Sequence, residues 1–164
     1  MNKILERNAL RNELQELRKK GKKIAFTNGC FDILHVGHVR YLREAKKTAD
    51  VLVLALNSDS SVRSIKGEKR PLMNENERAE ILAALEFIDF ITIFEELTPL
   101  ELICCLQPDI LIKGGDWPEE KVVGREEVKV WGGRVAIIPE IEGKSTTNIV
   151  EKIKKLYCSN KESY

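Results

Sequence analysis

The sequence predicts an α/β protein built on a doubly wound parallel sheet, and two observations carry this prediction. Short apolar runs alternate five times with stretches in which apolar residues show helical spacing. One of these runs, residues 51–56, is apolar at every position, as expected for a strand that is covered on both faces. This alternation implies right-handed crossovers, and such sheets bind their ligands beyond the carboxyl ends of the strands. We therefore expect the functional residues at that edge.

The expected strands are short and rich in β-branched and aromatic residues. In the first, residues 23–27, a lysine is followed by Ile-Ala-Phe-Thr, and a glycine-containing turn at 28–32 comes next. The run at 51–56 forms the second strand. Three shorter apolar runs complete the sheet at 90–94, 110–112 and 135–138.

The expected helices carry apolar residues at three- and four-residue spacing on otherwise charged faces. The first expected helix starts at residue 36 and shows this spacing over residues 39–47. The others lie at 75–86, 99–106, 123–131 and 147–156. A further helix at 3–20 contains Leu10, Leu14 and Leu17 and is expected to pack on the domain or on a second copy of it. We thus expect an N-terminal helix at 1–20, one domain at 21–157 and a flexible tail at 158–164.

The composition narrows the class of protein. A chain of 164 residues with 43% apolar content can bury one sizeable core, which argues for a single domain. The net charge of +1 provides no global field for a polyanion, so we expect no nucleic-acid partner. The sequence contains no membrane-length apolar run and no signal-peptide pattern, and its four cysteines lack Cys-x-x-Cys spacing. These features predict a cytoplasmic protein with reduced thiols and no membrane partner.

The two histidines of the chain, His35 and His38, stand within four residues at the expected start of a helix. The free N–H groups and the positive end of a helix favour anions, and two imidazoles at this spacing can converge on one phosphate. Gly29 permits a tight turn, and Gly37 lets a ligand approach the backbone. We interpret the segment as a phosphate site. The alternative is that the histidines satisfy backbone groups or pack against aromatic residues.

A second polar segment follows the strand at 51–56. Asn57-Ser58-Asp59 faces the same crevice, and a basic loop that contains Lys66 and Lys69 is expected to close over a triphosphate as charge builds on pyrophosphate. The alternative for this loop is an ordinary solvated surface.

Two further segments follow the later strands. In the first, paired glycines allow close approach to a planar base, Lys113 can reach phosphate, and Asp116 can accept a hydrogen bond from ribose or an amino group. Its alternative is a strand-to-helix turn with Trp117 as a lid on the core. In the second, Ser145-Thr146-Thr147 opens the final helix and offers phosphate donors, although the same residues are good ordinary N-caps.

The pattern Gly-x-Phe-Asp-x-x-His-x-Gly-His at 29–38 resembles the signature of the nucleotidyltransferase superfamily, and the Ser-Thr-Thr segment resembles its second signature. From about residue 22 to residue 154 the chain is similar throughout to the heptose 1-phosphate adenylyltransferase family. The matching features are Thr27-Asn28-Gly29, Phe31 to His35 with Gly37-His38, Asn57-Ser58-Asp59, Lys66-Gly67, Arg70-Pro71, Lys113 to Asp116 and Ser145 to Ile149.

This resemblance implies a Rossmann-like sheet of the nucleotidyltransferase (HxGH) type and an enzyme that transfers AMP from ATP to a sugar 1-phosphate. The products would be ADP-heptose, for lipopolysaccharide core synthesis, and pyrophosphate. Relatives are often fused behind a sugar kinase, whereas this chain is expected to be the stand-alone form. The resemblance also implies Mg²⁺ carried by ATP, with no metal ligands from the protein, and a homodimer whose interface the apolar positions of the first helix allow.

The expected site residues follow from these segments. The catalytic set comprises His35, His38, Lys66 and Lys69. The nucleotide-binding set comprises Thr27, Asn28, Gly29, Cys30, Phe31, Asp32, Lys113, Gly115, Asp116, Ser145, Thr146 and Thr147. Within this set, Asp32 is expected to orient an imidazole or a water molecule, or else to cap its turn.

Two alternatives to the adenylyltransferase are a glycerol-3-phosphate cytidylyltransferase-like enzyme and a nucleotide-binding module without turnover. The cytidylyltransferase carries an aspartate where this chain has Gly115 and an arginine where Glu140 stands, and both differences disfavour cytidine. Many other adenylyltransferases have an arginine in the place of Val150, so lysines must neutralise the outer phosphates here. The fold alone does not exclude the binding module.

Overall fold

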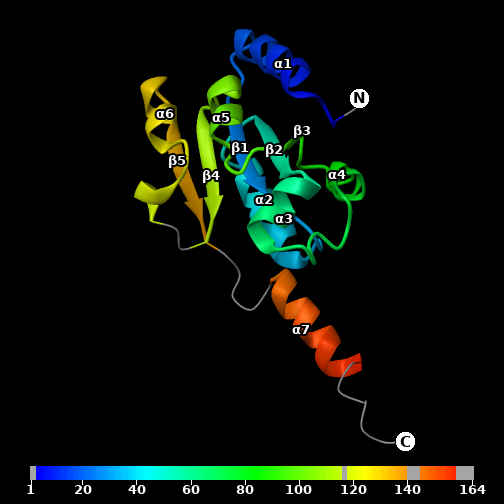
Figure 1. The fold of residues 1–164 in the computed structure, drawn as a ribbon. Helices are drawn as coiled ribbons and strands as arrows, with labels where there is room; N and C mark the ends of the chain where they lie inside the picture. The colour runs from blue at the N-terminus through cyan, green and yellow to red at the C-terminus, as the bar shows by residue number, and fades with distance from the viewer. Residues whose placement is uncertain (1–2, 116–117, 140–144, 158–164) are drawn as a thin grey trace, which may run out of the picture.

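The computed structural model describes residues 3–115, 118–139 and 145–157 and has a parallel sheet at its centre (Figure 1). The sheet order is β3-β2-β1-β4-β5. Its strands are β1 (Ile24–Gly29), β2 (Val51–Asn57), β3 (Phe90–Phe94), β4 (Ile110–Gly114) and β5 (Arg134–Ile138), and every neighbouring pair is parallel. The chain winds outward from β1 to β3 and then crosses back to β4, which confirms the predicted doubly wound sheet.

The point where the winding reverses lies between β1 and β4. These strands are paired at Ala25 with Ile110 and at Phe26 with Leu111, and no further pair joins them within the described residues. By contrast, β1 and β2 are paired along six positions from Ile24 to Gly29. Because β1 and β4 separate towards their carboxyl ends, a crevice opens at the place where doubly wound sheets bind ligands.

Helices cover both faces of the sheet. Side chains of α1 (Arg7–Lys19), α5 (Leu100–Leu106) and α6 (Arg125–Val130) join the core on one face. Those of α2 (Val36–Lys46) and α4 (Glu75–Ala83) join the core on the other face. All seven residues of β2 are buried, as expected for a strand with helices on both sides.

The N-terminal helix is part of the domain core. Leu10 and Leu14 of α1 have no exposed surface, and Arg18 donates hydrogen bonds to the carbonyls of Leu106 and Gln107 at the end of α5. Ahead of the helix, the Leu5 N–H donates to the carbonyl of Ile91 in β3 at 2.9 Å. Of the two packing arrangements expected for this helix, the structure has the one on its own domain.

One predicted element was wrong. The segment after β2 was expected as a loop, but α3 (Asp59–Lys66) forms there because the Ser58 hydroxyl accepts a hydrogen bond from the Ser61 N–H and caps it. The helix expected at 123–131 is confirmed as α6, and a short 3₁₀ turn, η1 (Glu119–Lys121), precedes it. Gly124 is the N-cap residue of α6; its φ is +88°, and a Cβ there would lie 2.8 Å from the Ile103 side chain.

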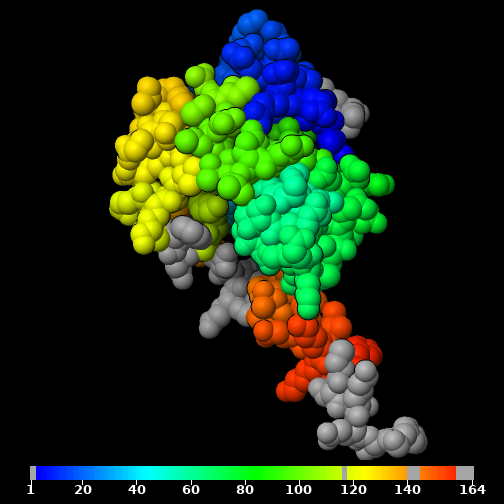
Figure 2. All heavy atoms as spheres, in the orientation of Figure 1, coloured from blue at the N-terminus to red at the C-terminus, as the bar shows by residue number. Residues whose placement is uncertain are grey.

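The final helix, α7 (Thr146–Tyr157), extends away from the rest of the domain (Figures 1 and 2). None of its residues is buried, and its first turn contacts the domain where the Thr146 hydroxyl donates to the Ile33 carbonyl at 3.4 Å. The predicted tail at 158–164 lies outside the described residues. Among the described residues, no helix has the length and apolarity to cross a membrane.

Candidate active site

A cavity of about 650 Å³ lies at the carboxyl edge of the sheet, in the crevice predicted from the sequence. Residues from the ends of β1, β2 and β4 line it, together with the first turns of α2 and α7. The lining residues are Asn28, Gly29, Cys30, Phe31, Asp32, His35, Gly37, His38, Tyr41, Asn57, Ile65, Lys66, Leu97, Thr98, Pro99, Lys113, Gly114, Val123, Ser145, Thr146 and Thr147. A volume of this size is typical of small-molecule sites.

The two histidines form a stacked pair in this cavity. Their ring centroids are 3.7 Å apart and their planes differ by 22°. His35 is the N-cap residue of α2, and His38 lies in its first turn. Both imidazoles therefore sit at the positive end of the helix, as the sequence predicted.

The electrostatic environment keeps His38 neutral. Burial lowers its pKa most, and the neighbouring His35 and Lys66 lower it further, whereas a hydrogen bond to the Ile33 backbone raises it; the resulting pKa is about 4. Its buried Nδ1 has no hydrogen-bond partner among the described residues. A neutral imidazole carries one N–H donor, which bonds the Ile33 backbone here, so His38 can donate to an anion only when this N–H exchanges that partner for the anion.

The turn after β1 brings an aromatic ring against the histidines. Phe31 has a positive φ of +45°, and its ring centroid lies 5.0 Å from that of His38. A Cβ at residue 29 would lie 2.8 Å from the Phe31 ring. Gly29 is therefore required by this ring contact rather than by a turn conformation. Both interpretations of the histidines therefore apply, because His38 packs against an aromatic ring and also lines the cavity.

Asp32 has a different role from the predicted ones. Its carboxylate is almost fully buried and accepts hydrogen bonds from Arg70 at 2.5 Å and from the N–H groups of Leu72 and Met73 at 2.6 and 3.1 Å. Burial alone would raise the pKa of Asp32, but these bonds outweigh it and the pKa is lowered. Asp32 thus holds the segment after α3 against the β1 turn, and neither histidine is among these bonded partners.

The basic residues divide into two groups. Lys66, in the last turn of α3, and Lys113, near the end of β4, both line the cavity. Burial lowers the pKa of Lys113, as expected for an ammonium group that is partly withdrawn from water. Lys69 is exposed and is not one of the described residues that line the cavity. The structure therefore brings Lys113 to the site and leaves Lys69 outside it.

The segment after β4 only partly follows the prediction. Gly114 lines the cavity, and a Cβ there would lie 3.1 Å from the Tyr41 ring. Gly115 has a φ of +91°, and its N–H donates to the Ile138 carbonyl of β5. Thr27 is buried behind the cavity wall, where its hydroxyl lies 2.6 Å from the Tyr41 hydroxyl. The expected site residue Asp116 lies outside the described residues.

The start of α7 combines the two predicted roles of the Ser-Thr-Thr segment. The Ser145 hydroxyl accepts a hydrogen bond from the Asn148 N–H at 3.1 Å, which is an ordinary N-cap contact. Ser145, Thr146 and Thr147 also line the cavity. A capped helix start therefore faces the same space as the histidine pair.

Several lining residues were missed by sequence reasoning. They are Tyr41, Ile65, Leu97, Thr98, Pro99 and Val123. Residues 97–99 follow β3 along the chain, so the rule that singled out Asn57 after β2 also applies to them. Tyr41 and Ile65 had no such signal, because Tyr41 reads as part of an apolar helix face and Ile65 lies in a segment that was expected as a loop.

Within residues 3–115, 118–139 and 145–157, no group of three or more His, Cys, Asp or Glu side chains could hold a metal ion. The carboxylate at the cavity wall, Asp32, is already engaged by Arg70 and two N–H groups.

Residues 26–152 match the family model described as cytidylyltransferase-like. The chain belongs to the cytidylyltransferase-like family. This membership confirms the predicted class of nucleotidyltransferase and, with the parallel sheet, the predicted fold.

The most informative relatives of this family member are bacterial. The chain is 57% identical over 155 residues to "Bifunctional protein HldE" of Pelobacter propionicus and 56% identical to the protein of that name from Geobacter metallireducens. Each match covers 94% of this chain and 32% of the relative. The chain therefore spans about a third of the length of these curated relatives.

Solved structures agree with this assignment. A lipopolysaccharide core biosynthesis protein from Thermoplasma volcanium superposes with a TM-score of 0.63 at 29% identity, covering 76% of this chain and all of that one. Pantoate-beta-alanine ligase from Francisella tularensis superposes with a TM-score of 0.61 over 93% of this chain and 77% of that one. The second pair is only 16% identical, so it supports the fold alone.

Proposed function

We propose that this chain transfers AMP from ATP to heptose 1-phosphate and so produces ADP-heptose and pyrophosphate for lipopolysaccharide core synthesis. The observation that carries the proposal is the stacked pair His35 and His38, placed at a helix start in a cavity that also contains Lys66 and Lys113. The similarity to proteins named HldE and to a lipopolysaccharide core biosynthesis protein supports the choice of acceptor.

The proposed reaction is an in-line displacement at the α-phosphorus of ATP. An oxygen of the sugar phosphate forms the new bond to this phosphorus, and the bond to the β-phosphate oxygen breaks with its electron pair on pyrophosphate. The sugar phosphate is already an anion at neutral pH, so the reaction needs no general base. Catalysis then consists of positioning and of stabilising charge in the transition state.

The cavity residues have distinct proposed parts in this reaction. The imidazoles donate hydrogen bonds to α- and β-phosphate oxygens, and for His38 this requires that its N–H turns from the Ile33 backbone to the phosphate. Lys66 and Lys113 supply the positive charge that the outer phosphates need. Mg²⁺, held by the triphosphate and water, supplies further charge neutralisation on the leaving pyrophosphate.

We propose that the nucleotide lies on the side of the cavity formed by the end of β4 and the start of α7. Lys113 and Gly114 contribute there, together with the hydroxyls of Ser145, Thr146 and Thr147. The β1 turn, with Asn28 to Phe31, forms the adjoining wall. Thr27 acts indirectly, through its contact with the Tyr41 hydroxyl.

The compartment and the oligomeric state stay predictions. A cytoplasmic location suits enzymes that use ATP. A homodimer is implied by the family resemblance, but Leu10 and Leu14 of α1 are fully buried within their own domain and do not supply its interface.

Pyrophosphate release tests the proposed function. Purified chain is incubated with ATP or CTP and with heptose 1-phosphate or glycerol 3-phosphate, and we expect turnover to be fastest with ATP and heptose 1-phosphate. Faster turnover with CTP and glycerol 3-phosphate would establish the cytidylyltransferase alternative. Absence of pyrophosphate with every pair, despite ATP binding, would indicate a binding module. His38→Ala serves as the matched control, and its kcat is expected to fall about a hundredfold because one phosphate donor is lost.

A further inference from the structure

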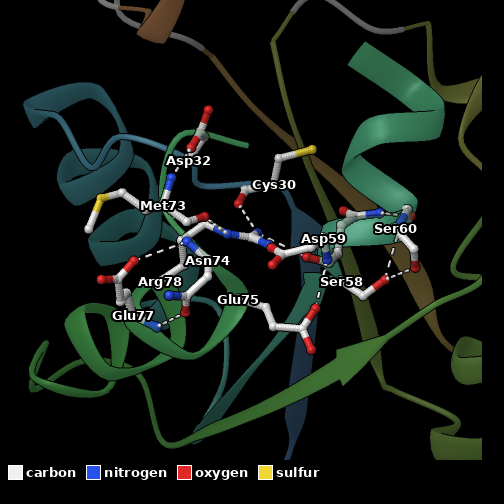
Figure 3. Close-up of polar contacts among 12 residues, drawn as sticks. Cys30, Asp32, Ser58, Asp59, Ser60, Met73, Asn74, Glu75, Glu77 and Arg78 are labelled. Carbon is white, nitrogen blue, oxygen red and sulfur yellow. Dashed lines mark hydrogen bonds and ion pairs between the residues drawn. The ribbon is translucent and has the colours of Figure 1, made fainter. Parts of the chain in front are cut away.

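The guanidinium of Arg78 is buried beneath the candidate active site. Arg78 lies within α4 and is 1% exposed. It donates to the carbonyl oxygens of Met73 at 3.0 Å, Cys30 at 2.6 Å and Asn57 at 2.9 Å, and to the Asp59 carboxylate at 2.7 Å (Figure 3). One side chain thus joins the β1 turn, the end of β2 and the start of α4.

A second buried contact lies next to the first. Asp32 accepts from Arg70 and from the N–H groups of Leu72 and Met73. Met73 belongs to both contacts, because its N–H donates to Asp32 while its carbonyl accepts from Arg78. The two anchors therefore form one connected network, which we call the arginine clamp: Arg78, Asp32, Arg70 and Met73.

The arginine clamp holds the residues on both sides of Phe31. Arg78 fixes the carbonyl of Cys30, and Arg70 with two N–H groups fixes the carboxylate of Asp32. Phe31 itself has a φ of +45°, a conformation that a bulky side chain adopts only when its surroundings hold it there. Its ring packs against the imidazole of His38.

We propose that Arg78 and Asp32 are positioning residues that keep Phe31 in its left-handed conformation and thereby set the placement and burial of the His38 imidazole. This assignment concerns geometry in the protein without substrate, and only its consequence for turnover rests on the proposed function. Arg78 contacts the backbone of two lining residues, Cys30 and Asn57, which distinguishes it from a side chain that merely fills the core.

The test follows the His38 imidazole directly by NMR. The chain has only two histidines, so the imidazole region of the spectrum contains two sets of signals. In the wild-type protein, burial and the neighbours His35 and Lys66 hold the pKa of His38 at about 4. The other ionisable side chains that line the same cavity are Cys30, Asp32, Tyr41 and Lys113, and all of them are retained in Arg78→Lys and Arg78→Met.

Both variants are expected to raise the pKa of His38 by about one unit or more, because a released Phe31 ring admits water to the imidazole. Lysine keeps the charge but lacks the planar fork that reaches four acceptors. The pKa of His38 in Arg78→Lys is therefore expected to lie between those of the wild-type protein and Arg78→Met. In turnover assays, kcat is expected to fall about tenfold or more, with the KM for ATP changed by less than about threefold.

Arg18→Met is the matched control, because Arg18 also donates to backbone carbonyls, those of Leu106 and Gln107, far from the cavity. This variant is expected to lower the melting temperature and to leave the His38 imidazole signals and their pKa unchanged. If Arg78→Met does not fold, Arg70→Met decides, since it removes the other half of the clamp from a less buried position.

A folded Arg78 or Arg70 variant with an unchanged pKa of His38 would overturn the proposal. The same holds if Arg18→Met shifts this pKa as much as the clamp variants do. Absence of turnover in the wild-type protein would instead contradict the proposed function, and the NMR comparison would still decide the role of the clamp.

Discussion

The low pKa of His38 makes the stability of the protein depend on pH in a narrow window. In the unfolded chain the imidazole takes up a proton near its ordinary pKa of 6.5, whereas in the folded protein it does so only near 4. Between these values the unfolded state binds more protons. The free energy of unfolding therefore falls as the pH is lowered from about 7 towards 4.

The size of this effect follows from the shift. A change from 6.5 to about 4 corresponds to at most about 3 kcal/mol at 1.36 kcal/mol per pKa unit. His38 keeps some contact with the water in the cavity, and solvent screening reduces the expected contribution to about 1–2 kcal/mol. Roughly 60% of this contribution is lost when the pH falls from about 7 to about 5, so the free energy of unfolding decreases by about 1 kcal/mol.

Urea unfolding of the wild-type protein and of His38→Gln, at about pH 7 and about pH 5, measures this loss. The carboxylates with lowered pKa values, Glu16, Asp32, Asp50 and Glu96, contribute stability that is lost only below their ordinary values of 3.8 for Asp and 4.5 for Glu. The window therefore isolates the histidines, and His35 is present in both proteins. The wild-type protein should lose about 1 kcal/mol more than the variant. Equal losses would refute the burial of a neutral His38.

Three further predictions concern other parts of the chain. Gly29→Ala should cost about 1–3 kcal/mol and reduce kcat, because its Cβ would lie 2.8 Å from the Phe31 ring; an unchanged melting temperature and kcat would contradict this contact. Lys113→Met should raise the KM for ATP about tenfold or more, while Lys69→Met, outside the cavity, should leave it within about twofold; equal kinetics would remove Lys113 from the site. Leu14→Ala should lower the free energy of unfolding by about 2–5 kcal/mol, as measured by urea denaturation, and a loss below about 0.5 kcal/mol would mean that α1 is not part of the core.

The arrangement of strands and helices was predictable from residue patterns because each pattern acts over a few residues. The fully apolar run before Asn57 indicated a strand covered on both faces, and β2 is buried throughout. The segment 59–66 was not recognised as a helix, because its polar face resembles a loop and its start depends on the Ser58 cap. The start of α6 at Gly124 was not predictable to the residue, because a Cβ there would meet Ile103, a neighbour that is distant in the sequence.

The site was predictable to the extent that it follows strand ends. His35, His38 and Lys113 follow or stand near such ends, and all three line the cavity. The separation of Lys69 from Lys66 was not predictable, because it depends on where α3 stops and where the chain turns at Gly67.

The sequence by itself determined the doubly wound sheet, the edge at which ligands bind and the histidine pair, because periodicity and motif spacing are local properties of the chain. Only the tertiary structure decided the partners of Asp32 and Arg78 and the conformation of Phe31. These contacts join residues about 40 positions apart, and a buried charge is placed by whichever donors and acceptors the packed elements bring to it.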